Sequence, residues 1–290
     1  MNLSICIPTF RRAEMLRQLL ESIRKNKLQS GIFEVIIVDS GLSFDNTEEV
    51  VQSFQELPIR YIKKEKDDGL DRVVKEMLNI AKGKFSWLIS DDDIVLDDSL
   101  NHINTLINSN NMLGGLVLNY KAFTSNLSHT FPPHDAFNGK RLNALTYFDN
   151  CSELFKRVGL HMGYLSCLII NTAHAKDILS NKNIDIPENL WGHTIIAGYI
   201  SKINPNWIYS DFAGVGYRAD SDSILKSIGI IERQKVTHKN FFDVITLIFG
   251  SHSAEERTIR KQLISKRVPR SILNMKTKDF SVRDQYKVFR

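Results

Sequence analysis

Three consecutive aspartates, Asp91, Asp92 and Asp93, follow an aromatic and apolar run in the stretch WLISDDDIVLDDSL at residues 87–100. Adjacent carboxylates repel one another, so such a cluster needs a compensating charge. Mg²⁺ and Mn²⁺ prefer oxygen ligands and usually take one or two carboxylates together with phosphate oxygens. The triplet therefore indicates either a metal site or a solvated turn ahead of a helix.

The second acidic group of this stretch has a different interpretation. Asp97, Asp98 and Ser99 stand directly before the apolar positions of LNHINTLI. Side chains of these types accept hydrogen bonds from the first N–H groups of a helix, and the helix dipole favours negative charge there. We expect these three residues to cap a helix and to have no catalytic role.

Strand and helix signals alternate over the first hundred residues. Short apolar runs, rich in β-branched residues, predict strands at 3–7, 33–39, 59–63 and 85–89, the first of them ended by Pro8. Apolar side chains recur at helical spacing between these runs, at 13–25, about 47–54 and 73–81. This alternation implies parallel strands joined by right-handed crossovers, and the predicted fold class is α/β.

Polar residues follow three of the predicted strands. The first strand leads into Pro8-Thr9-Phe10-Arg11-Arg12, the second ends at Asp39, and the fourth leads into the aspartate triplet. Ligands of open parallel sheets bind beyond the carboxyl ends of the strands, so these groups should share one rim. A basic pair beside two acidic sites suits a metal-bound nucleotide diphosphate. Singly, each has a structural interpretation: a solvated helix start for the arginines and a turn for Asp39.

The second half of the chain has weaker signals. Strands are expected at 115–120 and 165–170, with a loop between them that Pro132 and Pro133 interrupt. From Ser223 onward the pattern is helical and ends in a basic tail.

Composition narrows the class of protein only broadly. The chain has 290 residues, 42% of them hydrophobic and 24% charged, with a formal charge of +5, as in ordinary globular proteins. The opening residues are too short an apolar run for a signal-peptide core, and no run approaches a membrane span. The three cysteines form no CxxC pair, so neither a disulfide framework nor a zinc site is expected, and a cytoplasmic location is predicted.

Three motifs, in order, resemble a known family. PTFRR resembles the P-T-[YF]-[NR]-R signature of family 2 glycosyltransferases, and FEVIIVDSGLSFDNTEEVV resembles their next block. AKGKFSWLISDDDIVLDDSL is similar to the block that carries their metal-binding DxD motif. The resemblance covers roughly residues 2–100. The stretch DDGLDRVVKEMLNIAKGKFSWLISDDD also resembles the branch of abequosyltransferases and related O-antigen sugar transferases.

This resemblance implies a GT-A fold, a Rossmann-like, mostly parallel sheet flanked by helices with a C-terminal helical extension. We expect residues 1–120 to form the nucleotide-sugar-binding half of one domain and 121–220 its acceptor-binding half. Residues 221–290 should form a helical, basic extension.

The resemblance also assigns site residues by position. Contacts to the nucleotide-sugar are expected from Pro8, Thr9, Phe10, Arg11, Asp39, Gly69, Asp71, Arg72 and Asp91. Asp39 would contact the base, and Asp71 or Arg72 would lie on the diphosphate side. Ser90 stands at the first aspartate of the DxD motif, so the first expected ligand of Mn²⁺ or Mg²⁺ is Asp92. Asp91 or Asp93 would replace what Ser90 lacks.

The implied reaction is an inverting sugar transfer in which a carboxylate deprotonates the acceptor hydroxyl. Candidate bases are Glu188, Asp185 and His193 in NIDIPENLWGHTIIAGY, and Asp211 further on. Two of these residues have an alternative: Glu188 as a helix-start charge and His193 as a metal ligand or a satisfied core histidine. Trp191 either stacks on an acceptor sugar or lies in the core, and Arg218 either contacts phosphate or forms a surface salt bridge.

The expected partners are a nucleotide-sugar donor and a glycan or lipid-linked acceptor, and not nucleic acid. The apolar NFFDVITLIFG and the basic run 257–290 either contact an anionic membrane surface or pack on the core. Competing functions are a sugar-nucleotide-binding scaffold without catalysis and a nucleotidyltransferase, although PTFRR lacks the glycines of a phosphate loop. No GxGxxG follows the first strand, which disfavours a dinucleotide oxidoreductase.

Overall fold

The computed structural model describes residues 1–26, 32–41, 45–110, 112–131, 142–219 and 223–266. Its first part is a parallel sheet in the order β3-β2-β1-β4. The strands are β1 (Leu3–Thr9), β2 (Phe33–Asp39), β3 (Ile59–Lys63) and β4 (Phe85–Leu88). The crossover helices are α1 (Ala13–Lys25), α2 (Thr47–Gln52) and α3 (Leu70–Ile80). The predicted α/β alternation is confirmed.

The second part of the chain extends the same sheet. Its strands are β5 (Ile94–Val95), β6 (Gly115–Phe123), β7 (Leu145–Phe148), β8 (Leu168–Asn171) and β9 (Trp207–Arg218). The order continues β4-β8-β6-β9-β5, and β7 pairs with β9. Because β8 is antiparallel to both β4 and β6 while β6 is parallel to β9, strands β1, β2, β3, β4, β6 and β9 all point the same way. Their carboxyl ends therefore form one rim.

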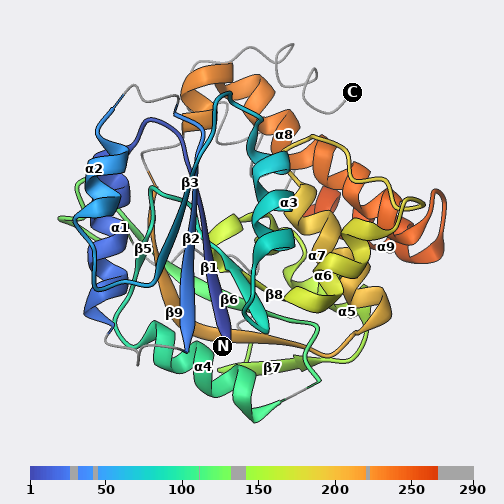
Figure 1. The fold of residues 1–290 in the computed structure, drawn as a ribbon. Helices are drawn as coiled ribbons and strands as arrows, with labels where there is room; N and C mark the ends of the chain where they lie inside the picture. Colours follow the sequence, from blue (N-terminus) through green and yellow to red (C-terminus); the bar gives the residue numbers. More distant parts are fainter. Residues whose placement is uncertain (27–31, 42–44, 111, 132–141, 220–222, 267–290) are drawn as a thin grey trace.

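Helices cover both faces of the sheet and enclose two hydrophobic clusters (Figure 1). One cluster packs β-strand residues such as Ile37 against α1, α2 and α4 (Ser99–Ser109). The other packs residues such as Ile36 against α3 and the later helices. Those helices are α5 (Cys151–Val158), α6 (Thr172–Ser180), α7 (Gly192–Ile203), α8 (Ser223–Phe249) and α9 (Ala254–Lys266). Because side chains alternate along a strand, β2 supplies both clusters and is buried along its whole length.

Two local strand expectations differ from the structure. β1 continues past Pro8 to Thr9, because β4 pairs only as far as Cys6, so no neighbour on that side needs the missing N–H of Pro8. Residues 165–167, expected to be strand, form a short 3₁₀ helix, η2 (Leu165–Cys167), which follows η1 (His161–Gly163). The shorter strand β8 begins only after η2.

The start of α4 lies where the capping residues predicted it, but their side chains do not cap it. Asp98 occupies the N-cap position with a left-handed φ of 61° and no capping hydrogen bond from its side chain. Ser99 instead donates to the carbonyl oxygens of Leu96 and Gly214. The expectation of side-chain capping was therefore wrong.

The C-terminal helices pack on the core. The side chains of Phe241, Val244, Ile245 and Ile248 are buried in the cluster that also holds Trp191. The apolar face of NFFDVITLIFG is therefore used within the fold. Residues 267–290 of the basic tail lie outside the described part of the chain. Among the helices that are described, none combines the length and the apolar character that crossing a bilayer requires.

Candidate functional site

Asp39 ends β2 with its carboxylate held by two donors. The Gly41 amide donates to Oδ1 at 2.7 Å, and the Tyr61 hydroxyl donates to Oδ2 at 2.6 Å. A Cβ on Gly41 would lie 2.9 Å from Asp39 Oδ1 and 3.1 Å from the Arg11 amide nitrogen, so the close approach of the β1 and β2 ends requires glycine here. Burial and the Asp39 carboxylate raise the pKa of Tyr61, which therefore stays a donor. Tyr61 was not among the site residues predicted from the sequence. Its place beside Asp39 depends on strand register, because Tyr61 pairs with Ile37 of β2.

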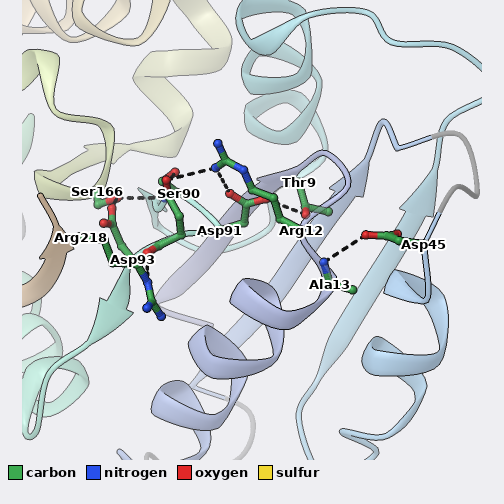
Figure 2. A network of polar contacts seen from close by, with 10 residues as sticks. Thr9, Arg12, Ala13, Asp45, Ser90, Asp91, Asp93, Ser166 and Arg218 are labelled. Atoms are coloured by element: carbon green, nitrogen blue, oxygen red, sulfur yellow. Dashed lines mark hydrogen bonds and ion pairs between the residues drawn. The ribbon is translucent and has the colours of Figure 1, made fainter. Parts of the chain in front are cut away.

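Asp91 joins the end of β4 to the end of β1 (Figure 2). The Thr9 hydroxyl donates to Asp91 Oδ2 at 2.8 Å, and Arg12 Nη1 donates to Oδ1 at 2.8 Å. Burial raises the pKa of Asp91 to about 6, while the nearby Arg12 charge opposes that rise. The carboxylate therefore ties two strand ends together from inside the protein.

Asp92 is the most accessible carboxylate of the triplet. Its side chain is 17% exposed, against 4% for Asp91. The Ser90 hydroxyl donates to Asp92 Oδ1 at 2.6 Å, and Arg12 Nη1 lies 3.1 Å from Oδ2. A ligand on the rim would meet this side chain before its two buried neighbours.

Asp93 points into the protein, toward η2. The Ser166 hydroxyl donates to Asp93 Oδ2 at 2.5 Å and accepts from the Ser90 amide at 2.9 Å. Burial, and then repulsion from Asp92, raise the pKa of Asp93 to about 8. Asp93 therefore anchors the loop to the second half of the chain.

Arg218, at the end of β9, fixes the same loop from the other side (Figure 2). Its side chain is buried and donates to the Asp92 carbonyl oxygen at 2.6 Å, to Gln18 Oε1 at 2.6 Å and to the Ser125 carbonyl oxygen. Of the two predicted alternatives for Arg218, the surface salt bridge is wrong because the side chain is buried, and contact with phosphate stays a prediction. Arg218 shapes the triplet loop through these contacts.

The carboxylate oxygens of the aspartate triplet suit Mg²⁺ or Mn²⁺ when other groups complete the coordination. Within the described ranges, no group of three or more His, Cys, Asp or Glu side chains is arranged to hold a metal ion. Within the triplet, Asp92 is the carboxylate that is partly exposed at the rim. Mg²⁺ and Mn²⁺ bind through one or two carboxylates when phosphate oxygens and water supply the remaining ligands. Asp92 fits such an ion if a diphosphate accompanies it.

The predicted residues at the start of α3 hold a neighbouring turn. Gly69 precedes the helix with a φ of 78°, a conformation that favours glycine. The buried Asp71 carboxylate accepts from the amides of Leu190 at 2.7 Å and Gly192 at 3.0 Å. Asp71 thus satisfies N–H groups at the start of α7. Arg72 pairs with Glu188, with Nε and Oε1 2.5 Å apart.

The candidate bases on this turn lie in different environments. Glu188 is 49% exposed, and its hydrogen bond with Arg72 lowers its pKa. Asp185 is exposed. His193 is buried, and its Nε2 lies 3.2 Å from the Gly163 carbonyl oxygen. Its Nδ1 has no hydrogen-bond partner among the described residues, and burial lowers its pKa. Asp211 is exposed at a bulge of β9, where it accepts from Asn119 at 2.9 Å and Tyr209 at 3.1 Å.

Trp191 lies in the core. Its indole N–H donates to the Val236 carbonyl oxygen at 2.6 Å, and its ring fills the space that a Cβ on Gly163 would occupy. The core alternative for Trp191 is therefore the one the structure shows.

The remaining predicted residues form the exposed tip of the β1 end. Phe10 is 41% exposed, and the Arg11 guanidinium carbon lies 5.0 Å from the centre of its ring. Arg11 has a left-handed φ of 55°, which turns the chain from β1 into α1. Pro8 is partly buried beside them. The structure thus brings 8–12, Asp39 and 90–93 to one rim, while Asp71 and His193 lie buried around the turn at 188–193.

Fold and rim together define an α/β protein of the GT-A type. A family model described as glycosyl transferase family 2 matches residues 4–160, more than half of the 290 residues. The chain belongs to this family.

Curated relatives match over shorter stretches. The chain is 33% identical over 112 residues to abequosyltransferase RfbV of Salmonella typhimurium, which covers 38% of this chain and 33% of that protein. It is 30% identical over 100 residues to glycosyltransferase GlyG of Streptococcus pneumoniae, covering 34% and 32%. The chain thus spans about a third of the length of the curated relatives it matches.

Solved structures match the whole fold at low identity. TarS 1-349 of S. aureus in complex with UDP-GlcNAc superposes with a TM-score of 0.72 at 18% identity, covering 99% of this chain and 78% of that one. The mannosyltransferase PcManGT of Pyrobaculum calidifontis, in complex with GDP-Man and Mn²⁺, gives a TM-score of 0.64 at 12% identity, covering 98% and 77%. The predicted GT-A fold is confirmed.

Proposed function

We propose that this protein transfers a sugar from a nucleotide-sugar to a glycan or lipid-linked saccharide in the synthesis of a cell-surface polysaccharide. The observation that carries the proposal is the rim itself. Asp39, Asp91 and Asp92 lie at the ends of parallel strands, and Thr9 and Arg12 join two of those ends. Membership of family 2 and the similarity to RfbV support the same function.

In this proposal the nucleotide lies over the ends of β1 and β2. Asp39 is fixed by two donors and would accept an N–H of the base. The tip formed by Pro8, Thr9, Phe10 and Arg11 would pack against base and ribose. The diphosphate side would face Gly69 and Arg72 at the start of α3. Asp91 would act indirectly, by holding the β1 end in place through Thr9.

Asp92 would hold the divalent cation, Mn²⁺ or Mg²⁺, and Asp93 would support that loop from inside. When bound, the cation would stabilise negative charge on the leaving diphosphate. The accessibility of Asp92 relative to Asp91 supports this assignment. A neighbour in fold, PcManGT, was solved in complex with GDP-Man and Mn²⁺.

Glu188 is our first candidate for the base that deprotonates the acceptor hydroxyl, with Asp185 and His193 as alternatives. Glu188 is a half-exposed carboxylate on the turn that packs on the start of α3. A base must be ionised before it accepts a proton, and the Arg72 pairing favours the ionised form of Glu188. Attack from the face opposite the leaving group would invert the anomeric centre.

Thermal melts with a panel of UDP-, GDP-, CDP- and dTDP-sugars, with and without Mn²⁺, test the proposal. We expect one nucleotide class to raise the melting temperature, and Asp39→Asn to abolish that rise. Stabilisation by none of the panel would contradict the proposal. Release of the nucleoside diphosphate on adding acceptor then separates an enzyme from a sugar-nucleotide-binding scaffold, which would be stabilised without turnover.

We also propose peripheral contact with the cytoplasmic face of the membrane, where a lipid-linked acceptor would be met. Residues 267–290 contain seven Lys or Arg and two Asp, which favours anionic lipid. Sedimentation with anionic liposomes should weaken when residues after Lys266 are removed. Equal sedimentation of the full chain and the truncated protein would contradict this contact.

A further inference from the structure

Arg12 lies at the centre of the rim, one residue before α1. A single atom of its guanidinium, Nη1, lies 2.8 Å from Asp91 Oδ1 and 3.1 Å from Asp92 Oδ2. The side chain is partly buried, 24% exposed. One positive charge therefore lies close to two carboxylates, at a site where bulk water screens their attraction incompletely.

Both oxygens of the Asp92 carboxylate are already engaged by the chain. Ser90 donates to Oδ1 at 2.6 Å, and Arg12 contacts Oδ2. A cation that binds Oδ2 must displace the guanidinium, or bind with that positive charge beside it. Either way, Arg12 opposes the binding of a metal ion at the side chain best placed to hold one.

Ser90 makes this opposition stronger. A serine at this position adds a hydroxyl that donates to Asp92, where an aspartate would add a second negative charge. The loop therefore attracts a divalent cation less than a loop with one more carboxylate, and Arg12 balances part of the charge that remains.

We propose that Arg12 is a built-in cation that competes with the divalent metal for Asp92 and keeps metal affinity low in the free protein. Arg12 is thus a positioning residue for the metal ligand. The inference rests on the proposed function only in taking Asp92 as that ligand. A purely structural role for Arg12, as the anchor of Asp91, predicts the opposite result, because loss of the anchor would disorder the loop and weaken metal binding.

Mn²⁺ affinity of the full chain, measured by electron paramagnetic resonance with Mn²⁺ alone, tests the proposal. We expect Arg12→Gln to bind Mn²⁺ at least about tenfold more tightly than the wild type. Arg12→Lys keeps the charge and should stay close to the wild type. Arg17→Gln, which removes a charge from the exposed face of α1, is the matched control and should change little. Asp92→Asn added to Arg12→Gln should abolish the gain.

If Arg12→Gln does not fold, Mn²⁺ binding by Ser90→Asp is measured in its place. The added carboxylate should also tighten Mn²⁺ binding several-fold, because it offsets the Arg12 charge and adds an oxygen ligand. Unchanged or weaker binding in folded Arg12→Gln overturns the proposal, and so does unchanged binding in Ser90→Asp when that is the only folded variant. The Mn²⁺ titrations contain no nucleotide-sugar. Failure of the proposed function would therefore be seen in the thermal melts with the donor panel and not in these titrations.

Discussion

The Tyr61 hydroxyl lies 2.6 Å from Asp39 Oδ2, so a side chain of β3 fixes the carboxylate at the end of β2. The Gly41 amide holds the other oxygen at 2.7 Å. A carboxylate with both oxygens fixed presents its remaining lone pairs in a constant direction. This relationship makes Asp39 a preorganised acceptor for a donor group on a ligand.

Tyr61→Phe should weaken nucleotide binding about tenfold. The variant removes a hydrogen bond to a charged acceptor, which contributes about 1.5–3 kcal/mol, without opening a large cavity. Titration calorimetry with the nucleoside diphosphate chosen from the donor panel measures the loss. Tyr147→Phe, at an exposed position of β7, is the control. Equal affinities for wild type and Tyr61→Phe would mean that Asp39 does not contact the base.

Asp93→Asn should stabilise the protein increasingly as the pH rises from about 4 to 8. The pKa of Asp93 is about 8 in the folded protein and about 3.9 in an unfolded chain. Between these values the folded state binds more protons, so ionisation of the unfolded state lowers wild-type stability as the pH rises. Asparagine removes this penalty and keeps an acceptor for Ser166.

We expect the difference in unfolding free energy between Asp93→Asn and wild type to grow by at least about 1.4 kcal/mol, the equivalent of one pKa unit, between pH 5 and pH 8. Urea unfolding at both pH values measures it. Asp97→Asn, an exposed aspartate of the same stretch, is the control. A difference that shrinks with rising pH would show that Asp93 is ionised in the folded state.

Asp71→Ala should destabilise the protein by about 3 kcal/mol, because two buried amides lose a charged acceptor. Its carboxylate accepts from Leu190 and Gly192, so the damage should centre on the start of α7. Hydrogen exchange should speed up at 190–195. Asp67→Ala, at an exposed turn where Asp67 accepts from Gly69 at 2.9 Å, is the matched control. Equal stability losses in the two variants would contradict this role.

Glu188→Gln should lower the turnover number about 10²- to 10⁴-fold if Glu188 is the base, with donor binding unchanged. The turnover number of Arg72→Gln at saturating donor separates this effect from loss of the ion pair, because this variant breaks the pair and keeps the carboxylate, and saturation removes any change in donor binding at Arg72. Because an exposed ion pair contributes little to stability, both variants should fold. Turnover of Glu188→Gln at the wild-type rate would leave Asp185 and His193 as the candidates.

Much of the rim was predictable because its residues follow strands whose apolar patterns are strong. The β2 run is buried throughout, so its length fixed the position of Asp39 at the strand end. Parallel crossovers place the carboxyl ends of β1, β2 and β4 at the same edge, so Asp39 and the aspartate triplet were expected on one rim.

Contacts between distant parts of the chain were not predictable. Asp71 and its partner Leu190 are 119 residues apart in the sequence. Arg218 and its partner Gln18 are 200 residues apart. Buried polar residues depend on partners that the local pattern does not reveal. The same limit applies to Trp191, whose aromatic character fits a sugar platform as well as the core position it occupies. The division of the chain at residues 120 and 220 stays a prediction.

Strand β8 has a consequence for how the chain acquires its fold. Residues 168–171 form the strand that separates β4 from β6, so β4 has an unpaired edge until that part of the chain exists. Ser166, just before β8 in the chain, and Arg218, well after it, also contact the aspartate loop. A nascent chain ending near residue 160, where the family match ends, would lack β8 and leave the apolar edge of β4 unpaired, which favours self-association. The smallest fragment expected to fold by itself therefore extends at least through β9.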